Sequence, residues 1–589
     1  MMPRISIPVG RRPPARMVAA ALAATSLLLL ATRAAVSRAE LHAATISNAP
    51  RITSYRNPVL PGVHPDPSVV RVGDWFYLVN SSFEMFPGVP IHRSRDLVHW
   101  EALGYVLTRD SQLPLAGAGP SGGIFAPTIR YHVGTFYMIT TNVSHRGTFF
   151  VTAKDPAGPW SEPIWVGASG GIDPSLFFDD DGKVYLTSTG SMPGIYQAQI
   201  DVASGKLLTQ PRIVWKGTGG RYPEGPHLYK IAGRYYLMIS EGGTEYGHMV
   251  TIARASSPWG PFEPCPRNPI LTHRDTPMSQ PIQGTGHADL VEDVEGNWWM
   301  VFLGFRPEGG YYWHNLGRET FLAPVRWDAQ GWPVVNGGKP IALDMHVRGL
   351  PATATPTPPV RENFDAWTKP GSARQSPSRE GLGTLPGVPS ELSPLGPVWN
   401  FLRNPVRASF STTERRGWLT LHGTAVPLDQ EKGISPTFVG RRQEHLAVRM
   451  ATRLDFAPGR EGEEAGLVLY RAPRQHYELG VRRNGGVREV FVRQTVGAYL
   501  STVTATVPAP GTDPLLLQID AEADRYTFSW GPSPEHLQPI GAAETRLLST
   551  EVAGGFIGTY VGLYALAPGG DPNPVPAAFD WFDYQPAQP

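Results

Sequence analysis

The sequence predicts an all-β chain in which a five-bladed β-propeller is followed by a β-sandwich. Of its 589 residues, 64 are glycine and 60 are proline, and aromatic residues make up 10%. This turn-rich and aromatic-rich composition is typical of β structure. A unit of polar turn, strand, glycine-containing hairpin and aromatic-rich strand recurs five times, and shorter alternating strands fill the C-terminal third. No helical period competes with this pattern over a comparable length.

The five repeated units begin at short polar turns that lie 47 to 62 residues apart. Each unit is long enough for four strands, which is the size of a propeller blade. The innermost strands of a propeller line its axis, so residues at the same place in each repeat should meet near one end of the channel. Those residues are Asp66, Phe125, Asp173, Glu224 and His287.

Asp66 occupies the stiffest of these turns, His64-Pro65-Asp66-Pro67-Ser68. Proline fixes its own φ and favours extended geometry in the residue before it. We therefore expect an extended backbone at Asp66 and a carboxylate with a well-defined direction. An aspartate that only shapes the turn before a strand is the alternative for this motif taken alone.

Beyond the repeats, residues 350–359 (LPATATPTPP) read as a linker. The strings Trp418–Leu421, Ala447–Met450 and Leu467–Tyr470 alternate as strands do, which fits a two-sheet sandwich. We expect an exposed loop at 372–397. The predicted organisation is a signal peptide at 1–39, a catalytic propeller at 50–349, a linker at 350–360 and a sandwich at 361–589.

The N-terminus has the features of an export signal. Arginines precede an apolar run that is short for a membrane span, and small residues follow it. The sequence therefore predicts a secreted or periplasmic protein, with a membrane anchor as the alternative. The segments are Arg4, Arg11, Arg12 and Arg16, the run 17–31, and Ser37-Arg38-Ala39.

Composition excludes several classes of partner. The formal net charge is +1, which gives no basis for nucleic-acid binding or stable association with an anionic membrane. The single cysteine, Cys265, excludes an intrachain disulfide framework and a cysteine-based zinc site. Abundant tryptophan and tyrosine suit neutral, hydroxyl-rich ligands, whose C–H faces pack on aromatic rings.

Three of the five converging residues are carboxylic acids, and mutual repulsion makes such a cluster costly without a function. Hydrolysis of a glycosidic bond needs one acid to protonate the leaving oxygen and a second carboxylate to activate water or attack carbon. Glu224 has the longer reach and suits the acid. Asp66 suits the base, and Asp173 then tunes the acid.

These motifs resemble glycoside hydrolase family 43. The likeness rests on the Asp66 turn and on the strings Ile172–Phe177 and Glu224–Tyr229. Ser82–Gly88 and Gly317–Trp327 resemble the branch of β-xylosidases and α-L-arabinofuranosidases, and Phe438–Gln443, Glu463–Gly466 and Gly554–Tyr560 resemble its C-terminal concanavalin-like β-sandwich. The resemblance implies an inverting mechanism with Asp66 as base, Asp173 as modulator and Glu224 as acid.

The resemblance also implies substrate-binding roles. Arg318 would bind sugar hydroxyls and bias the aspartates, with a surface ion pair to Glu319 or a neighbour as the alternative. Phe83 and Phe125 would line the sugar pocket, unless they only pack the blades. His287 would lie on the channel axis, where some family members hold a water network or a calcium ion. Phe556 would project from the sandwich as one wall of the pocket, with a place in the sandwich core as the alternative.

One departure from the family pattern concerns the second repeat. We expect Trp-Ala-Pro-Asp there, and this chain has Phe125-Ala126-Pro127-Thr128. The difference bears on substrate preference and not on the catalytic carboxylates.

The function predicted from these observations is an exo-acting β-1,4-xylosidase that releases xylose from xylo-oligosaccharides or arabinoxylan fragments. It needs no cofactor and no catalytic metal, with a structural calcium near His287 left open. The alternatives are an α-L-arabinofuranosidase or bifunctional enzyme, a galactan-directed relative, and a non-catalytic carbohydrate-binding protein.

Overall fold

The computed structural model describes residues 51–167, 170–308, 312–352, 360–365, 395–570 and 572–587. The predicted signal peptide, most of the linker (353–359) and most of the predicted loop (372–394) lie outside these ranges; Leu395, near the end of that loop, is buried rather than exposed. No helix among the described residues is long and apolar enough to cross a membrane.

The chain divides into two compact units, residues 1–53 with 347–354 and residues 54–346 with 355–589. In the smaller unit, residues 51–53 and 347–351 belong to strands β1 (Arg51–Arg56) and β25 (Asp344–Pro351), which pair in a two-stranded sheet. The larger unit contains the repeats and the C-terminal strands.

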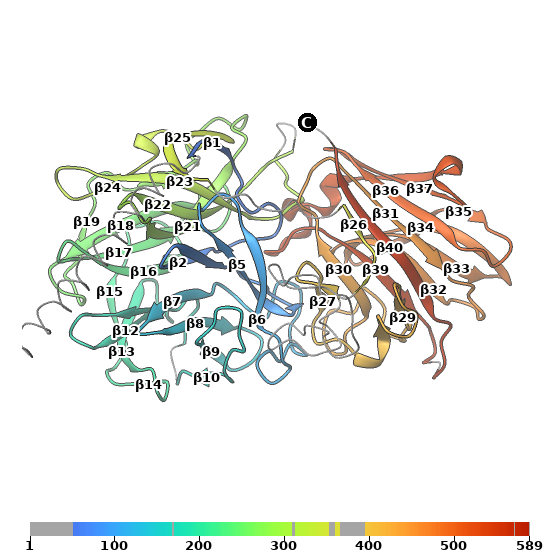
Figure 1. Ribbon diagram of the computed structural model, residues 1–589, viewed down its shortest axis with the longest axis horizontal. Helices are drawn as coiled ribbons and strands as arrows, with labels where there is room; N and C mark the ends of the chain where they lie inside the picture. Colours follow the sequence, from blue (N-terminus) through green and yellow to red (C-terminus); the bar gives the residue numbers. More distant parts are fainter. Residues whose placement is uncertain are drawn as a thin grey trace, which may run out of the picture. The chain divides into compact units, whose positions relative to one another are not determined.

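Five antiparallel sheets follow one another through the repeated part of the described chain, coloured from blue to yellow-green in Figure 1. They lie at the positions of the five predicted repeats. Each begins with a hairpin of its first two strands, as at Val133-Gly134, where both residues have the positive φ that a tight hairpin turn requires. The strands are β2 (Ser68–Val72), β3 (Trp75–Val79), β5 (Gly88–Ser94) and β6 (Glu101–Leu107); β7 (Thr128–His132), β8 (Thr135–Asn142), β9 (Gly147–Ala153) and β10 (Ile164–Trp165); β11 (Ser175–Phe178), β12 (Val184–Ser188), β13 (Ile195–Asp201), β14 (Lys206–Leu207) and β15 (Arg212–Trp215); β16 (Glu224–Ile231), β17 (Arg234–Glu241), β18 (Met249–Ala255), β19 (Glu263–Pro264) and β20 (Leu271–Thr272); and β21 (Gln283–Glu292), β22 (Trp298–Phe305), β23 (Glu319–Trp327) and β24 (Pro333–Val335).

The first strands of these sheets form a closed ring. Strand β2 contacts β7, β7 contacts β11, β11 contacts β16, β16 contacts β21, and β21 contacts β2 again. The segment before β2 strengthens the closure, because Val59 and Leu60 both donate backbone hydrogen bonds to Thr320 of the last sheet. A ring of radial sheets closed in this way is a β-propeller.

The C-terminal strands form two sheets, coloured orange to red in Figure 1. Apolar residues from both sheets share one core, which makes them a β-sandwich. The larger sheet has β26 (Arg361–Glu362), β28 (Phe410–Ser411), β29 (Leu419–Leu421), β31 (Val448–Asp455), β36 (Leu515–Ala521), β37 (Arg525–Gly531), β38 (Gln538–Glu544) and β40 (Ala577–Pro586). The smaller has β30 (Thr437–Arg442), β32 (Glu464–Ala472), β33 (Gln475–Asn484), β34 (Val487–Val496), β35 (Leu500–Pro508) and β39 (Tyr560–Leu566). The described helices are short: η1 (Asn336–Gly338), η3 (Arg407–Ser409), η4 (Pro534–His536), η5 (Thr545–Leu548) and α2 (Thr550–Ala553).

Propeller and sandwich are joined by paired backbone and by apolar packing. Strand β4 (Met85–Phe86), which follows the first hairpin of the propeller, pairs with β27 (Phe401–Leu402). A buried cluster behind this pair combines Phe83 and Met85 of the propeller with Phe438, Tyr470 and Ile557 of the sandwich. The two parts therefore share a packed boundary, and the predicted domain limits within it stay a prediction.

Candidate active site

The predicted carboxylates sit on unusual backbone at the turns that open the repeats. Asp66 has φ +53° and Asp173 has φ +55°, although both precede proline. The expected extended geometry at Asp66 is therefore wrong. Non-glycine residues adopt the left-handed region at a cost, and they persist there when surrounding contacts over-determine them. Such strain is concentrated at functional sites.

The left-handed positions also correct the register of the repeat. Gly225 and His287 share the positive φ of Asp66 and Asp173, and each of the four immediately precedes the Pro or Ala that marks its turn. Glu224 therefore lies one residue before the repeat position, where the register between β16 and β17 shifts. By the same alignment, Ala126 occupies the repeat position in the second unit, and Phe125 lies one residue before it. A Cβ on Gly225 would lie 3.1 Å from the His287 ring, so glycine there lets the histidine approach.

Asp66 is buried and held by specific partners. Arg318 Nη1 donates to its Oδ1 at 2.9 Å, Ser81 Oγ donates to its Oδ2 at 2.5 Å, and His287 Nδ1 lies 3.7 Å from Oδ1. Burial raises the pKa of Asp66, but Arg318, His287 and Ser81 outweigh burial and hold that pKa below its usual value. Asp66 is thus kept ionised, as a general base must be.

Asp173 interacts electrostatically with both of the other acids. The Gly225 N–H donates to its Oδ2 at 3.1 Å. Burial raises the pKa of Asp173 to about 7; His287 opposes that rise, and the negative charges of Glu224 and Asp66 add to it. The site therefore brings the three predicted carboxylates into one interacting group, in which burial and the neighbouring negative charges favour the neutral form of Asp173.

Glu224 is the most accessible of the three, with 18% of its side chain exposed. It begins β16, and its carboxylate lines the cavity. His248 Nε2 lies 3.6 Å from its Oε1 and has no hydrogen-bond partner within the described part of the chain. The ring of His248 packs where a Cβ on Gly286 would clash with it at 2.2 Å. His248 could not be identified from the sequence, because its ring is placed beside Glu224 by packing against Gly286, which is distant in the chain.

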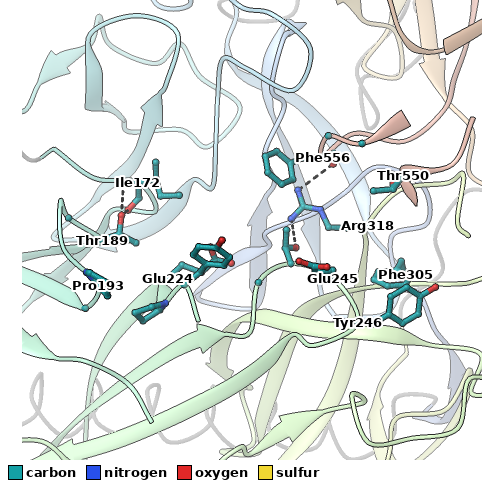
Figure 2. A pocket seen from close by; sticks show the side chains of 18 of the residues that line it. Ile172, Thr189, Pro193, Glu224, Glu245, Tyr246, Phe305, Arg318, Thr550 and Phe556 are labelled. Carbon is teal, nitrogen blue, oxygen red and sulfur yellow. Dashed lines mark hydrogen bonds between the residues drawn. The ribbon is translucent and has the colours of Figure 1, made fainter. Parts of the chain in front are cut away.

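The cavity measures about 860 Å³ and is lined by residues of both propeller and sandwich. Glu224 faces it from the fourth sheet, Arg318 from the turn before β23, and Thr550 and Phe556 from the sandwich (Figure 2). Exposed Met192 and Tyr222 also line it. The volume exceeds that of one pentose, so the cavity has room for a sugar and part of what is attached to it.

Arg318 links the base to the wall of the cavity. Besides Asp66, its Nη1 donates to Thr244 Oγ1 at 2.9 Å, and its Nη2 donates to the Phe556 carbonyl at 3.3 Å (Figure 2). The alternative ion pair with Glu319 is wrong, because Glu319 pairs with Arg306 at 2.7 Å. The guanidinium therefore lowers the pKa of Asp66, and its binding of sugar hydroxyls stays a prediction.

The three predicted phenylalanines gather at this wall. Phe556 lies on the loop between α2 and β39, outside the strands, and is 37% exposed. Its ring stacks on Phe83 at 6.1 Å between centroids and meets Phe125 edge-on at 5.8 Å. Phe83 is buried and supports Phe556 from behind. That these rings bind sugar stays a prediction.

His287 does not have the surroundings of a calcium ligand. Ser240 Oγ accepts a hydrogen bond from its backbone N–H at 2.6 Å, and the nearest carboxylate, Asp66, is already paired with Arg318. Calcium prefers six to eight oxygen ligands. Within the described ranges, no group of three or more His, Cys, Asp or Glu residues is placed to hold a metal ion. The residues present do not fit calcium there.

Comparisons with known proteins agree with this geometry. The sequence matches the family described as Glycosyl hydrolases family 43 over residues 55–333, and the Beta xylosidase C-terminal Concanavalin A-like domain over 391–585. It is 43% identical to the Non-reducing end alpha-L-arabinofuranosidase BoGH43B of Bacteroides ovatus, over 90% of this chain and 95% of the relative. It is 40% identical to a Xylosidase/arabinosidase of Butyrivibrio fibrisolvens, over 87% and 96%.

Solved structures extend the likeness to the fold. The Bacteroides ovatus Xyloglucan PUL GH43B structure matches with a TM-score of 0.83 at 42% identity, covering 91% of this chain and all of that one. A xylan beta-1,4-xylosidase from Bacillus halodurans C-125 matches with a TM-score of 0.80 at 34% identity, over 90% and 100%. The chain therefore belongs to glycosyl hydrolases family 43 and is a glycoside hydrolase.

Proposed function

We propose that this enzyme is an inverting, exo-acting β-1,4-xylosidase that uses Asp66, Asp173 and Glu224. One observation carries the proposal: the repeated turns bring three carboxylates together in graded environments. Asp66 is ionised and tightly held, Asp173 is buried with a raised pKa, and Glu224 faces the cavity. Inverting hydrolysis needs such a division between base and acid.

In the proposed reaction, Asp66 takes a proton from a water molecule as its oxygen attacks the anomeric carbon. The bond from that carbon to the leaving oxygen breaks on the opposite face, and Glu224 donates its proton to the leaving oxygen. Asp173 and Glu224 repel each other as anions, which favours one proton held by this pair until the bond breaks. Arg318 holds Asp66 in line through the 2.9 Å hydrogen bond.

Exo action is supported by the shape of the wall. Phe556, backed by Phe83 and Phe125, stands beside Arg318 where a bound chain would otherwise continue past the base. A pocket blocked on one side accepts only the terminal sugar of a chain. The exposed side of Glu224 then faces the leaving group, in the direction of Tyr222, two residues before it in the chain and also on the cavity wall.

A second candidate is α-L-arabinofuranosidase activity, alone or beside xylosidase activity. It is favoured by the name of the 43% identical relative, a non-reducing-end α-L-arabinofuranosidase, and by the double name of the 40% identical one. Terminal xylose or arabinose on xylan-derived oligosaccharides would be the natural substrate class. We further propose export through the N-terminal arginine-led apolar segment, which N-terminal sequencing of the secreted protein would test.

The deciding experiment compares 4-nitrophenyl β-D-xylopyranoside, α-L-arabinofuranoside, β-D-galactopyranoside and α-L-arabinopyranoside, each with and without the full-length enzyme. We expect the first two to be cleaved. Proton NMR early in turnover should show the α-anomer of xylose released from the β-xyloside. Early release of the β-anomer would overturn the mechanism, and carbohydrate binding without any cleavage would overturn the enzymatic function.

A further inference from the structure

Glu84 is a buried carboxylate beside the sugar pocket that the proposed reaction does not use. It follows Phe83 in the chain and is 1% exposed. Its Oε2 accepts a hydrogen bond from the Ser121 backbone N–H at 3.1 Å, and its Oε1 has no hydrogen-bond partner among the described residues. Burial raises the pKa of Glu84 to about 7, against the lowering influence of Ser121, Arg471 and Arg403. A buried group with one unpaired oxygen requires an explanation.

The first partner of Glu84 leads directly to the wall of the pocket. Ser121 gives its backbone N–H to Glu84, and its Oγ accepts the backbone N–H of Phe556 at 2.8 Å. Ser121 also approaches the preceding residue closely, since a Cβ on Gly555 would lie 2.4 Å from Ser121 Oγ. Glycine is therefore required at 555, and the loop is seated on the propeller at a defined point.

The charge of Glu84 leads to the same loop by a second route. Arg471 of β32 is 1% exposed and is one of the two cations that lower the pKa of Glu84. Its Nη2 donates to the Gly554 carbonyl at 2.8 Å and to Thr550 Oγ1 at 3.1 Å. The loop 554–556 is thus held at Phe556 by Ser121 and at Gly554 by Arg471. Ser121 is hydrogen-bonded to Glu84, and the charge of Arg471 lowers the pKa of Glu84.

The part of the loop that is held is the part that shapes the pocket. The Phe556 ring stacks on Phe83, the neighbour of Glu84 in the chain, and lies 5.5 Å from the Arg318 guanidinium. The glycines at 554 and 555 both have positive φ, so the loop itself offers little resistance to movement. Its position depends on the contacts that anchor it.

We propose that Glu84 is a positioning residue that, through Ser121 and Arg471, fixes the sandwich loop 554–556 so that Phe556 closes the sugar pocket. This inference rests on the proposed glycosidase function and deepens it, because it makes pocket closure a property of a buried carboxylate at the propeller–sandwich boundary. Replacing Glu84 by glutamine removes the carboxyl group that accepts from Ser121 and whose charge acts on Arg471, which loosens the loop, while Asp66, Asp173 and Glu224 keep their contacts.

The test is a double-mutant cycle on the full-length enzyme with the aryl glycoside that it cleaves fastest. Glu84→Gln and Phe556→Ala should each lower kcat/KM about 5-fold, mainly through a higher KM, as expected for the loss of one aromatic contact. Because both act on the same wall, Glu84→Gln should lower kcat/KM less than about 2-fold when Phe556 is already Ala. A merely destabilising change would lower activity equally in both backgrounds.

Glu308→Gln is the matched control. Glu308 is also a 1% exposed glutamate with one unpartnered oxygen within the described chain, and its other oxygen accepts from Thr545 of the sandwich rather than from the loop. Its effect should be the same with Phe and with Ala at 556. If Glu84→Gln does not fold, Glu84→Asp, which keeps the charge but shortens the reach, takes its place in the cycle.

Independent, multiplying effects of the Glu84 and Phe556 substitutions would overturn the inference. So would a Glu84 variant with unchanged KM and a lowered kcat. If the wild-type enzyme cleaves none of the aryl glycosides, the proposed function fails instead, and the two failures are distinguishable.

Discussion

Two aspartate–arginine pairs are buried in the same ring of strands, and they differ in how fully their oxygens are used. In the first pair, Asp289 of β21 meets Arg130 of β7 at 2.9 Å. In the second, Asp66 meets Arg318 at 2.9 Å. Asp289 is surrounded by donors: Arg130 twice, Ser68 Oγ, Tyr229 OH, and the backbone N–H groups of Val69 and Leu290.

Asp66 has fewer donors, and they leave part of its carboxylate open. Arg318 and Ser81 donate to it, and His287 stays at 3.7 Å.

The pKa of Asp289 reflects its many donors. Burial raises this pKa, but the opposing effects of Arg130, His227 and Tyr229 are larger and bring it down to about 2. A saturated carboxylate of this kind serves the fold, because nothing further can reach it. A carboxylate with a free lone pair and a fixed direction can bind a water molecule, so in this comparison incomplete pairing separates the proposed base from the structural aspartate.

The largest effect should come from removing the charge of Asp66, the carboxylate with fewer hydrogen-bond donors. Asp66→Asn should lower kcat about 10³-fold on every substrate, since water activation is needed whatever the leaving group. The thermal midpoint should move less than in Asp289→Asn. Steady-state kinetics with an activated aryl xyloside and with xylobiose, beside thermal unfolding, check this. A variant that keeps one tenth of wild-type kcat would refute the assignment of the base.

The exposed carboxylate should show a graded effect. Glu224→Gln should lower kcat about 10²-fold or more on xylobiose and alkyl xylosides, and much less on aryl glycosides whose leaving groups need little protonation. The measurement is a series of aryl xylosides of increasing leaving-group pKa. Equal leaving-group dependence in Glu224→Gln and Asp66→Asn would show that the two roles are wrongly assigned.

The saturated pair should behave in the opposite way to Asp66. Asp289→Asn leaves Arg130 buried without its counter-charge, which typically costs about 3–5 kcal/mol. We expect the thermal midpoint to fall by roughly 10 °C, while kcat below that temperature changes only several-fold. Differential scanning calorimetry and kinetics on the same preparation decide the matter. A 10³-fold loss of kcat with an unchanged midpoint would erase the distinction between the two pairs.

The contrast also marks what the sequence alone could predict. The fold and the grouping of Asp66, Asp173 and Glu224 could be predicted because each belongs to a local string that recurs along the chain. The one-residue offset of Glu224 could not be predicted, because it arises from a strand irregularity that only pairing with β17 reveals. The left-handed backbone of Asp66 was missed for a related reason: local preference before proline favours extended geometry, and contacts with Arg318, 252 positions away, override it.

Residues that contact the site from distant segments could not be predicted from the sequence, for the same reason. Ser81 and His248 lie in strings with no special composition, and Glu84 lies in the family-like string Ser82–Gly88, which gives no sign of its partners. The importance of all three appears only when the ring closes and the sandwich packs against it. Phe556 could be proposed because two glycines precede it in a motif shared with the family. Its anchoring by Ser121, 435 positions earlier, has no local signal.

The smallest effect concerns Asp173, which shares the burial of Asp289 but has no arginine among the groups that set its pKa. Its pKa is raised in the folded protein to about 7, so the folded state resists ionisation of this group more than the unfolded state does. The penalty is absent below the unfolded pKa of about 4 and grows as the pH rises toward 7, where it becomes complete. Asp173→Asn removes the penalty. Its thermal midpoint should therefore equal that of the wild type near pH 4 and exceed it by a few degrees at pH 7 and above.

Asp289→Asn should show no such gain at any pH between 4 and 8, because the pKa of Asp289 is lowered. Midpoints of both variants across this range check the prediction, and a stabilisation by Asp173→Asn that does not change with pH would show that packing, not charge, sets the cost of the third carboxylate.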